Sequence, residues 1–250
     1  MIRITDTVKS LLIINVIFFV GKLSLGGWAY DLLALWFPQN ENFRFWQILT
    51  HMFMHGDEFH IFFNMFALFM FGSHLERSIG QRNFLFLYFS SGLGAAGLQI
   101  LFTYFKFLPG YEALIAMGLS PSEITEFINN SVQQGRYAIP EGMDVDTVRS
   151  MIDAYRIPMV GASGAIFGVL AAFAVMYPNL PLMILFIPIP IKAKYLIGGY
   201  FLMDLYGGIT GQALLGPSNV AHWAHIGGAV VGFITMWYWK KNSFNQNRWN

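Results

Sequence analysis

The chain has 250 residues, of which 55% are hydrophobic and 12% are charged, and its formal net charge is +1. This composition is too apolar for an ordinary soluble domain and predicts a membrane protein embedded in a lipid bilayer. The small net charge gives no basic surface for nucleic acid, and a sequence without cysteine excludes a disulfide scaffold, a thiol nucleophile and thiolate metal ligands.

A membrane-spanning helix needs about 20 mostly apolar residues. Windows of this kind are centred near Ile14, Ala67, Gly92, Phe167, Phe201 and Ile234. We therefore expect an all-α membrane protein with six transmembrane helices that form a single membrane domain over residues 1–250. The first window lacks a small-residue cleavage pattern after it, so we interpret it as a retained span and not as a signal peptide.

The positions of Lys and Arg predict the orientation, because cytoplasmic loops are enriched in both. With six spans and both termini on one side, that side receives Arg3, Lys9, Arg77, Arg82, Lys192, Lys194, Lys240, Lys241 and Arg248. We expect this side to be cytoplasmic, with the protein in the inner membrane of a bacterium.

Two long segments fall on the opposite side. Residues 28–59 are rich in aromatic side chains, which is typical of the headgroup level of a bilayer, so we expect this segment to lie in the interface. Residues 120–123 (Ser-Pro-Ser-Glu) have the form of a capping box, and a second helix is predicted over 145–155. We expect residues 107–158 to form an extracytoplasmic helical lobe inserted between the third and fourth spans.

Two spans begin with polar residues that need a reason, because polar groups inside a membrane are costly. The fourth begins with Gly161-Ala162-Ser163-Gly164, and the sixth contains His225 in its first turn. A histidine within reach of the serine can take the hydroxyl proton during attack on a carbonyl. Taken singly, each residue also fits a packing role, with the serine bonded to its own backbone and the histidine buried.

Glycine spacing favours a close approach of these two spans. Gly164 and Gly168 in the fourth span, and Gly228 and Gly232 in the sixth, are small residues four positions apart, a pattern that lets helix backbones nearly touch. Such an approach would bring Ser163 and His225, which lie on different helices, within hydrogen-bonding distance.

Acyl transfer also needs donors for the oxyanion of the tetrahedral intermediate. His60 and Asn64 lie four residues apart on one face of the second span, at its outer end, and both can donate. The backbone N–H of Ser163, at the positive end of its helix, would be a third donor.

Together, these motifs resemble those of the rhomboid family of intramembrane serine proteases. The matching residues are Gly161-Ala162-Ser163-Gly164 as the family's G-x-S-G motif, residues 221–228 as its alanine and histidine segment, and His60 with Asn64 as its oxyanion pair. The resemblance covers almost all of the chain and implies a rhomboid-like bundle. It also implies that Phe167 stacks under the catalytic histidine and that Glu76 tethers helix ends on the cytoplasmic side.

The resemblance implies a serine endopeptidase that acts through a dyad of Ser163 and His225, without a cofactor or a metal. His225 is selected over His222 because the family's catalytic histidine precedes a small-residue packing motif by one turn. The implied substrates are proteins with a single transmembrane helix, cleaved near its outer end, where the helix must unwind before the serine can reach a carbonyl.

Other functions are possible for such a chain. A catalytically inactive rhomboid-like relative could bind or escort membrane helices, although such relatives typically lose the serine or the histidine. A small transporter would need ionisable residues along several faces within the membrane, which the sequence lacks. A metal-dependent protease could use His51 and His55, but no H-E-x-x-H motif is present, so we expect these residues to orient the outer loop.

Three further positions complete the expectations. Asp204, in the fifth span, could be a third member of a triad, but the resembled family uses a dyad, so a structural role is favoured. Gln47 follows Trp46 where the family usually has an arginine, which leaves the contacts of that arginine unassigned. The lobe is longer than the connection usual in the family, and its effect on substrate access is not predicted.

Overall fold

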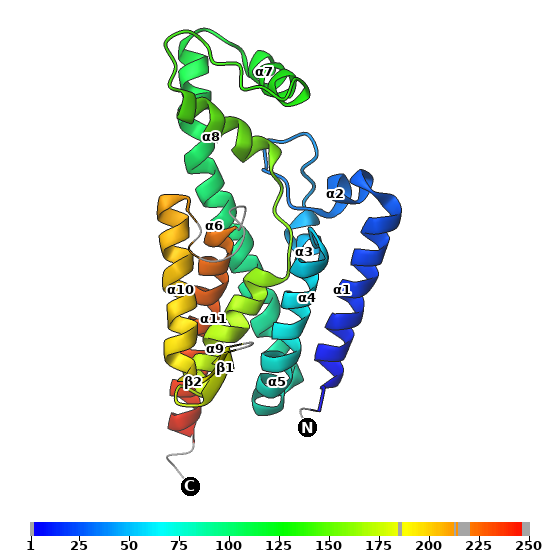
Figure 1. The fold of residues 1–250 in the computed structure, drawn as a ribbon, viewed down its shortest axis with the longest axis vertical. Coiled ribbons are helices and arrows are strands. Elements are labelled where there is room, and N and C mark those ends of the chain that lie inside the picture. Colours follow the sequence, from blue (N-terminus) through cyan, green and yellow to red (C-terminus); the bar gives the residue numbers. More distant parts are fainter. Residues whose placement is uncertain (1–2, 185–186, 213, 215–220, 247–250) are drawn as a thin grey trace.

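The computed structural model describes residues 3–184, 187–212, 214 and 221–246, and most of these residues are helical (Figure 1). The six predicted span centres lie within α1 (Asp6–Leu25), α4 (Glu58–Ala67), α6 (Gln81–Ala116), α9 (Ser163–Met176), α10 (Ala193–Thr210) and α11 (His222–Gln246). Within the described residues, α1 and α6 are long and apolar enough to cross a membrane, and α9 is a shorter apolar helix. A mainly helical fold is confirmed, whereas six spans stay a prediction.

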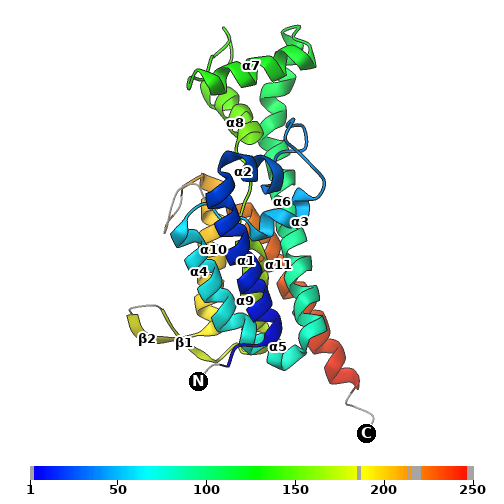
Figure 2. The same ribbon diagram turned by 90° about the vertical axis from the view of Figure 1, so that its right-hand side faces the viewer.

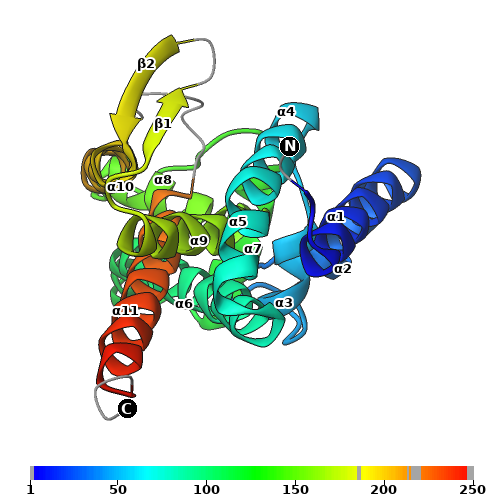
Figure 3. The same ribbon diagram turned by 90° about the horizontal axis from the view of Figure 1, so that it is seen from below.

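The long helices run side by side in one bundle (Figures 1 and 2). Helices α9 and α6 both pack along α11, and α10 lies against α11 (Figure 3). The main apolar core includes the fully buried side chains of Phe84 and Leu87 from α6 and of Val169 from α9. The two helices that carry Ser163 and His225 therefore lie at the centre of the bundle.

The second predicted span is a continuous helical run. Helix α4 continues through a π-helical turn, η2 (Leu68–Gly72), into α5 (Ser73–Ile79). Gly80 then turns the chain directly into α6 with φ of +80°, a backbone conformation that glycine adopts without steric cost. The π turn explains why one long span is divided into three elements.

Glu76 ties two elements together at the end of the bundle where α1 begins. Its Oε2 accepts a hydrogen bond from the Thr5 hydroxyl and another, 3.3 Å long, from the Val8 amide. The Glu76 side chain is buried, so α5 is fastened to the first turn of α1. This contact is the tether between helix ends that the resemblance implied.

Helix α6 extends farther than the sequence predicted. It has 36 residues, which corresponds to about 54 Å at 1.5 Å per residue, whereas the hydrocarbon core of a bilayer is about 30 Å thick. Residues 107–116, the first part of the predicted lobe, therefore continue this helix, and the extent of the lobe over residues 107–158 stays a prediction. Pro109 lies inside α6 without ending it.

The end of α6 carries a small lobe, as Figure 2 shows, with α7 (Pro121–Gln133) and α8 (Val145–Arg156). The predicted capping box begins α7, since the Ser120 side chain accepts from the Glu123 amide and the Glu123 side chain accepts from the Ser120 amide. Phe107, Ile128 and Met151 share an apolar core with Phe37 of the predicted interfacial segment. Both predicted lobe helices are confirmed.

A two-stranded hairpin corrects the all-α prediction. Strands β1 (Pro181–Ile184) and β2 (Ile187–Lys192) pair antiparallel between α9 and α10. In β2, isoleucine alternates with proline through residue 191, and a proline at every second position is incompatible with a helix interior. The alternation matches the two-residue period of a strand, and the segment is far shorter than a membrane-spanning window.

The predicted interfacial segment contains α2 (Gly27–Leu33), α3 (Gln47–Thr50) and the 3-10 turn η1 (His51–Phe53). Gln47 is fully buried, and its Nε2 donates to the carbonyl oxygens of Asp31 and Asn42, both at 2.9 Å. Its Oε1 accepts from the Arg44 amide at 3.1 Å. Gln47 thus joins three parts of this segment at the position where the family usually has an arginine.

Candidate active site

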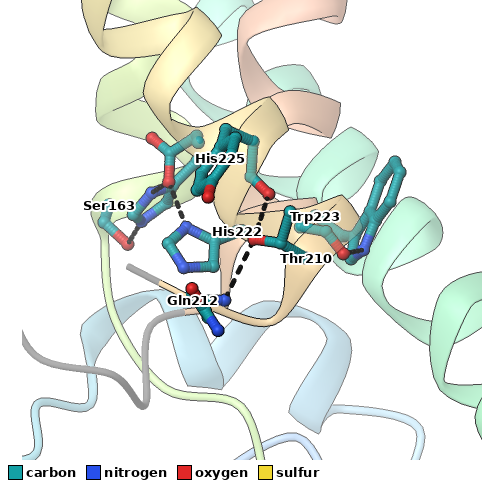
Figure 4. A network of polar contacts seen from close by, with 9 residues as sticks. Ser163, Thr210, Gln212, His222, Trp223 and His225 are labelled. Atoms are coloured by element: carbon teal, nitrogen blue, oxygen red, sulfur yellow. Dashed lines mark hydrogen bonds and ion pairs between the residues drawn. The ribbon is translucent and has the colours of Figure 1, made fainter. Parts of the chain in front are cut away.

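Ser163 and His225 are adjacent although 62 positions separate them in the sequence. Ser163 is the first residue of α9, and His225 lies in the first turn of α11. The His225 Nε2 lies 2.8 Å from the Ser163 Oγ. Figure 4 marks this contact with a dashed line. This is a hydrogen-bonding distance at which an imidazole can accept the serine proton.

The predicted close approach of the two glycine pairs is present. A Cβ atom built on Gly228 would lie 1.8 Å from the Gly164 carbonyl oxygen, and one built on Gly232 would lie 2.2 Å from that of Gly168. No side chain can occupy either position without moving the helices apart. The missing side chains therefore set the distance between α9 and α11 on which the contact of Ser163 with His225 depends.

Phe167 supports the histidine ring from one side. Its ring lies parallel to that of His225, with the ring centroids 4.1 Å apart and an angle of 9° between the planes. Phe167 follows Ser163 by one helical turn, so the same helix carries both the hydroxyl and the ring that restricts its partner. The stack limits rotation of the imidazole out of line with the serine.

Gly161 occupies the narrow space before Ser163. Its φ of +124° is a conformation that other residues rarely adopt, and a Cβ there would lie 2.8 Å from His60 Cε1 and Nε2 and 3.5 Å from Ser163 Oγ. Its amide donates to the His51 carbonyl at 2.9 Å. This loop therefore brings His60 and Ser163 close to one backbone position, and the amide at that position is bonded to η1.

The two predicted oxyanion donors differ in their surroundings. The His60 Nδ1 accepts a hydrogen bond from the Gly56 amide at 3.3 Å, so a neutral His60 ring carries its proton on Nε2, the atom near Gly161. Asn64 is buried, and its Nδ2 donates to the His60 carbonyl within α4 at 2.9 Å. The structure brings His60 beside Ser163 but gives Asn64 a partner inside its own helix.

Asp204 is the residue whose contact with the site was not predicted. Its Oδ1 accepts from the Nδ1 of His225 at 3.1 Å and from the Nδ1 of His222 at 2.6 Å. Figure 4 shows His222 and His225 side by side at this network. A carboxylate in an apolar segment indicates from the sequence that Asp204 has a polar partner. The sequence does not identify that partner, because both histidines lie on another helix.

His51 begins the turn η1, and His55 lies in the loop between η1 and α4, next to the ring of His60. His51 Nδ1 lies 2.9 Å from the Gln47 carbonyl, and the His55 and His60 rings are 5.0 Å apart. Burial lowers the pKa of His51 to about 4 and the pKa of His55 to about 3. Both side chains are therefore neutral at neutral pH and pack as part of the loop.

A cavity of about 500 Å³ lies below this site, between α9, α10 and α11. Phe167 forms part of its wall, whereas Ser163 and His225 do not. The remaining wall is mainly apolar, with Phe201 and Phe233 on the neighbouring helices and Lys194 as the charged residue. The cavity provides space under the Phe167 ring but no additional group beside the serine.

The family comparison matches the part of the chain that carries these residues. A family model described as the rhomboid domain matches residues 42–125 and 138–242, which include every predicted site residue. The break in the match falls inside the predicted lobe, and the model matches the rest of residues 107–158. An insertion over the whole of 107–158 thus stays a prediction.

Curated relatives show the same likeness. The chain is 26% identical over 195 residues to rhomboid protein 1, mitochondrial, of Saccharomyces cerevisiae, covering 78% of this chain and 42% of that protein. It is 27% identical over 194 residues to presenilin-associated rhomboid-like protein, mitochondrial, of Homo sapiens. This match covers 76% of this chain and 36% of that protein. A shorter match is to inactive RHOMBOID-like protein 8 of Arabidopsis thaliana. It has 33% identity over 67 residues and covers 27% of this chain and 19% of that protein. The chain spans less than half the length of these relatives.

These matches correct the expected location. The yeast and human relatives are both named as mitochondrial proteins, so the expectation of a bacterial inner membrane is wrong.

Proposed function

Since the chain belongs to the rhomboid family, whose members are generally intramembrane serine proteases, we propose that it is a serine endopeptidase acting within a membrane. The observation that carries this proposal is the 2.8 Å distance between Ser163 Oγ and His225 Nε2. The stack of Phe167 on His225 and the glycine contacts between α9 and α11 support it, because both hold this pair in place.

In the proposed reaction, His225 Nε2 takes the Ser163 proton while Oγ attacks the carbonyl carbon of the scissile bond. The resulting oxyanion accepts hydrogen bonds from His60 Nε2, the Ser163 amide and Asn64. His225 then gives its proton to the leaving nitrogen, and the peptide bond breaks to leave an acyl group on Ser163. Water, deprotonated by His225, releases this acyl group and restores the serine.

The substrates that we propose are proteins with a single transmembrane helix. Ser163 and His225 lie at the beginnings of α9 and α11, near the end of the bundle that carries the lobe, as Figure 1 shows. A substrate helix entering from lipid would meet them near its own end on that side. A helical peptide bond is shielded by the surrounding turn, so the substrate must unwind locally before attack.

We propose six spans: α1, the run from α4 to α5, α6, α9, α10 and α11. Helices α7 and α8 would then lie outside the bilayer, on the side opposite to the beginning of α1. Lys and Arg gather at the span ends on the side where α1 begins, as expected for the side that retains the termini. The names of the relatives favour a mitochondrial membrane as the location.

The second candidate function is that of an inactive rhomboid-like protein that binds or escorts membrane helices. A relative named as inactive matches a short part of the chain. Ser163 and His225 are both present and hydrogen bonded, which favours the active enzyme.

Labelling with a fluorophosphonate tests the proposed function. The purified protein should be phosphonylated at Ser163, and it should cleave a transmembrane substrate in detergent or liposomes. The Ser163→Ala variant should do neither while keeping the melting temperature of the native protein. Full cleavage by a folded Ser163→Ala variant, or no labelling of the native protein, would exclude the proposed chemistry.

A further inference from the structure

Three polar side chains form a continuous line across three helices. Ser163 on α9 contacts the Nε2 of His225 on α11 at 2.8 Å, and the Nδ1 of the same ring contacts Asp204 on α10 at 3.1 Å. Only 8% of Asp204 is exposed. Burying a carboxylate is costly unless it is paired, so its contact with two histidines needs a reason beyond chance.

The carboxylate determines which nitrogen of His225 carries the proton. A neutral imidazole has one N–H, and it can accept the Ser163 proton on Nε2 only if that proton is on Nδ1. Asp204 can only accept, so it favours Nδ1–H and leaves Nε2 free as the base. The stack with Phe167 fixes the plane of the ring but cannot distinguish the two tautomers.

His222 contacts the same carboxylate oxygen of Asp204. Its Nδ1 lies 2.6 Å from the same Oδ1 atom, and its ring fits against Gly207, where a Cβ would lie 2.6 Å from the His222 Nε2. Gly207 lies one turn before the end of α10, and the absence of a side chain there leaves room for the His222 ring. The contact fixes the position of Asp204 relative to α11.

We propose that Asp204 is a positioning residue for His225, so that the site works as a Ser163–His225–Asp204 triad. This inference rests on the proposed function and departs from the dyad that the family resemblance implies. Because Asp204 comes from α10, the base is correctly protonated and oriented only when α10 is packed against α11. The competing explanation is that Asp204 merely joins these two helices through His222.

The isosteric change Asp204→Asn separates the two explanations. The amide can donate to His225 and favour the tautomer with Nε2–H, which cannot accept the serine proton. The corresponding change in a chymotrypsin-like protease lowers kcat by about 10⁴-fold. We expect a fall of about 10²-fold or more here, with KM changed less than about threefold. Phosphonylation of Ser163, in which an O–P bond forms, fluoride leaves and His225 takes the proton, should slow in parallel.

Two controls accompany this variant. His222→Gln removes the joining contact, so it should lower the melting temperature and reduce kcat much less than Asp204→Asn does. Asp153→Asn changes an aspartate in the lobe, paired with Arg156 at 3.2 Å, and should leave cleavage unchanged. Equal losses of kcat in Asp204→Asn and His222→Gln would establish the joining role and overturn the triad.

A second pair of variants applies if Asp204→Asn does not fold. The Glu and Gln side chains have nearly the same volume and differ in charge. The Asp204→Glu variant should therefore turn over substrate at least tenfold faster than the Asp204→Gln variant. Equal kcat values in this pair, or native kcat in a folded Asp204→Asn variant, would overturn the inference. If the native protein is nevertheless labelled and active, these results contradict only the role of Asp204. A native protein that is not labelled contradicts the proposed function itself.

Discussion

The imidazole of His225 lies flat against the ring of Phe167, with centroids 4.1 Å apart and planes that differ by 9°. Phe167 also forms part of the wall of the cavity below it. One face of this phenyl ring therefore supports the proposed base, and its surroundings include open space. That combination allows its contribution to be measured by substitution.

Phe167→Leu should lower kcat by about two- to tenfold, because a ring stack contributes about 0.5–1.5 kcal/mol beyond simple burial. Phe167→Tyr keeps the stacked ring, and the cavity can accept the added hydroxyl, so it should retain near-native kcat. Steady-state cleavage and melting temperature are measured on the same preparations. A Phe167→Leu variant with native kcat would show that the stack does not restrain His225.

Gly228→Ala tests the contact between α9 and α11. The added Cβ would meet the Gly164 carbonyl at 1.8 Å, so the helices must separate, at a cost of about 1–3 kcal/mol or more. Both melting temperature and cleavage should fall, because separation also lengthens the contact of Ser163 with His225. Gly97→Ala on α6 is the matched control, since a Cβ there meets nothing within 4 Å. A Gly228→Ala variant that melts and cleaves like Gly97→Ala would contradict the close packing.

Local patterns in the sequence predicted the elements that local chemistry determines. The capping box at Ser120 and Glu123 begins α7 as expected, since its two hydrogen bonds join residues three positions apart. The paired glycines of α9 and α11 also predicted their own contact, because small residues at a spacing of four have few other uses in a membrane helix. Both signals can be identified without knowledge of distant contacts.

Contacts between distant segments were not predictable in this way. Asp204 contacts two histidines on α11, and nothing near it in the sequence identifies them. The side chain of Gln47, at the position where the family usually has an arginine, bonds to backbone groups of residues well before it, and these contacts require the folded loop to be known. The hairpin of β1 and β2 was missed because its strands are far shorter than a membrane span.

Stability should depend on pH through His51 and His55, which lie outside the proposed spans. Their pKa values are lowered to about 4 and about 3 by burial, against 6.5 for the ordinary group. The unfolded chain therefore binds more protons below pH 6.5, so stability is fully present above that value and is lost as pH falls toward 4. The loss should be on the order of 3 kcal/mol for each residue. Melting curves of His51→Gln and His55→Gln should show a smaller decline, and identical declines would contradict this origin.

His60 should contribute more to turnover than to substrate binding. Its Nε2 lies at Gly161, beside Ser163, where it can donate to a developing oxyanion. Loss of one such donor typically lowers kcat by about 10²- to 10³-fold, because the stabilisation acts mainly in the transition state. His60→Ala should therefore show this fall with little change in KM. A rise in KM with unchanged kcat would instead assign His60 to substrate binding.

Asn64 differs from His60 in that its Nδ2 already donates a hydrogen bond, to the His60 carbonyl at 2.9 Å. An amide carries two N–H groups, so the second can still reach an oxyanion. If it does, Asn64→Ala should reduce kcat sharply without abolishing it, unlike Ser163→Ala, and leave substrate affinity nearly unchanged. The matched control is Asn15→Ala on α1, where a buried Nδ2 makes the same kind of bond to the Leu11 carbonyl at 2.8 Å. That change should lower the melting temperature and affect turnover only as far as the protein unfolds. Native turnover in Asn64→Ala, or a loss no greater than in Asn15→Ala at equal stability, would remove Asn64 from the oxyanion site and leave His60 and the Ser163 amide as its donors.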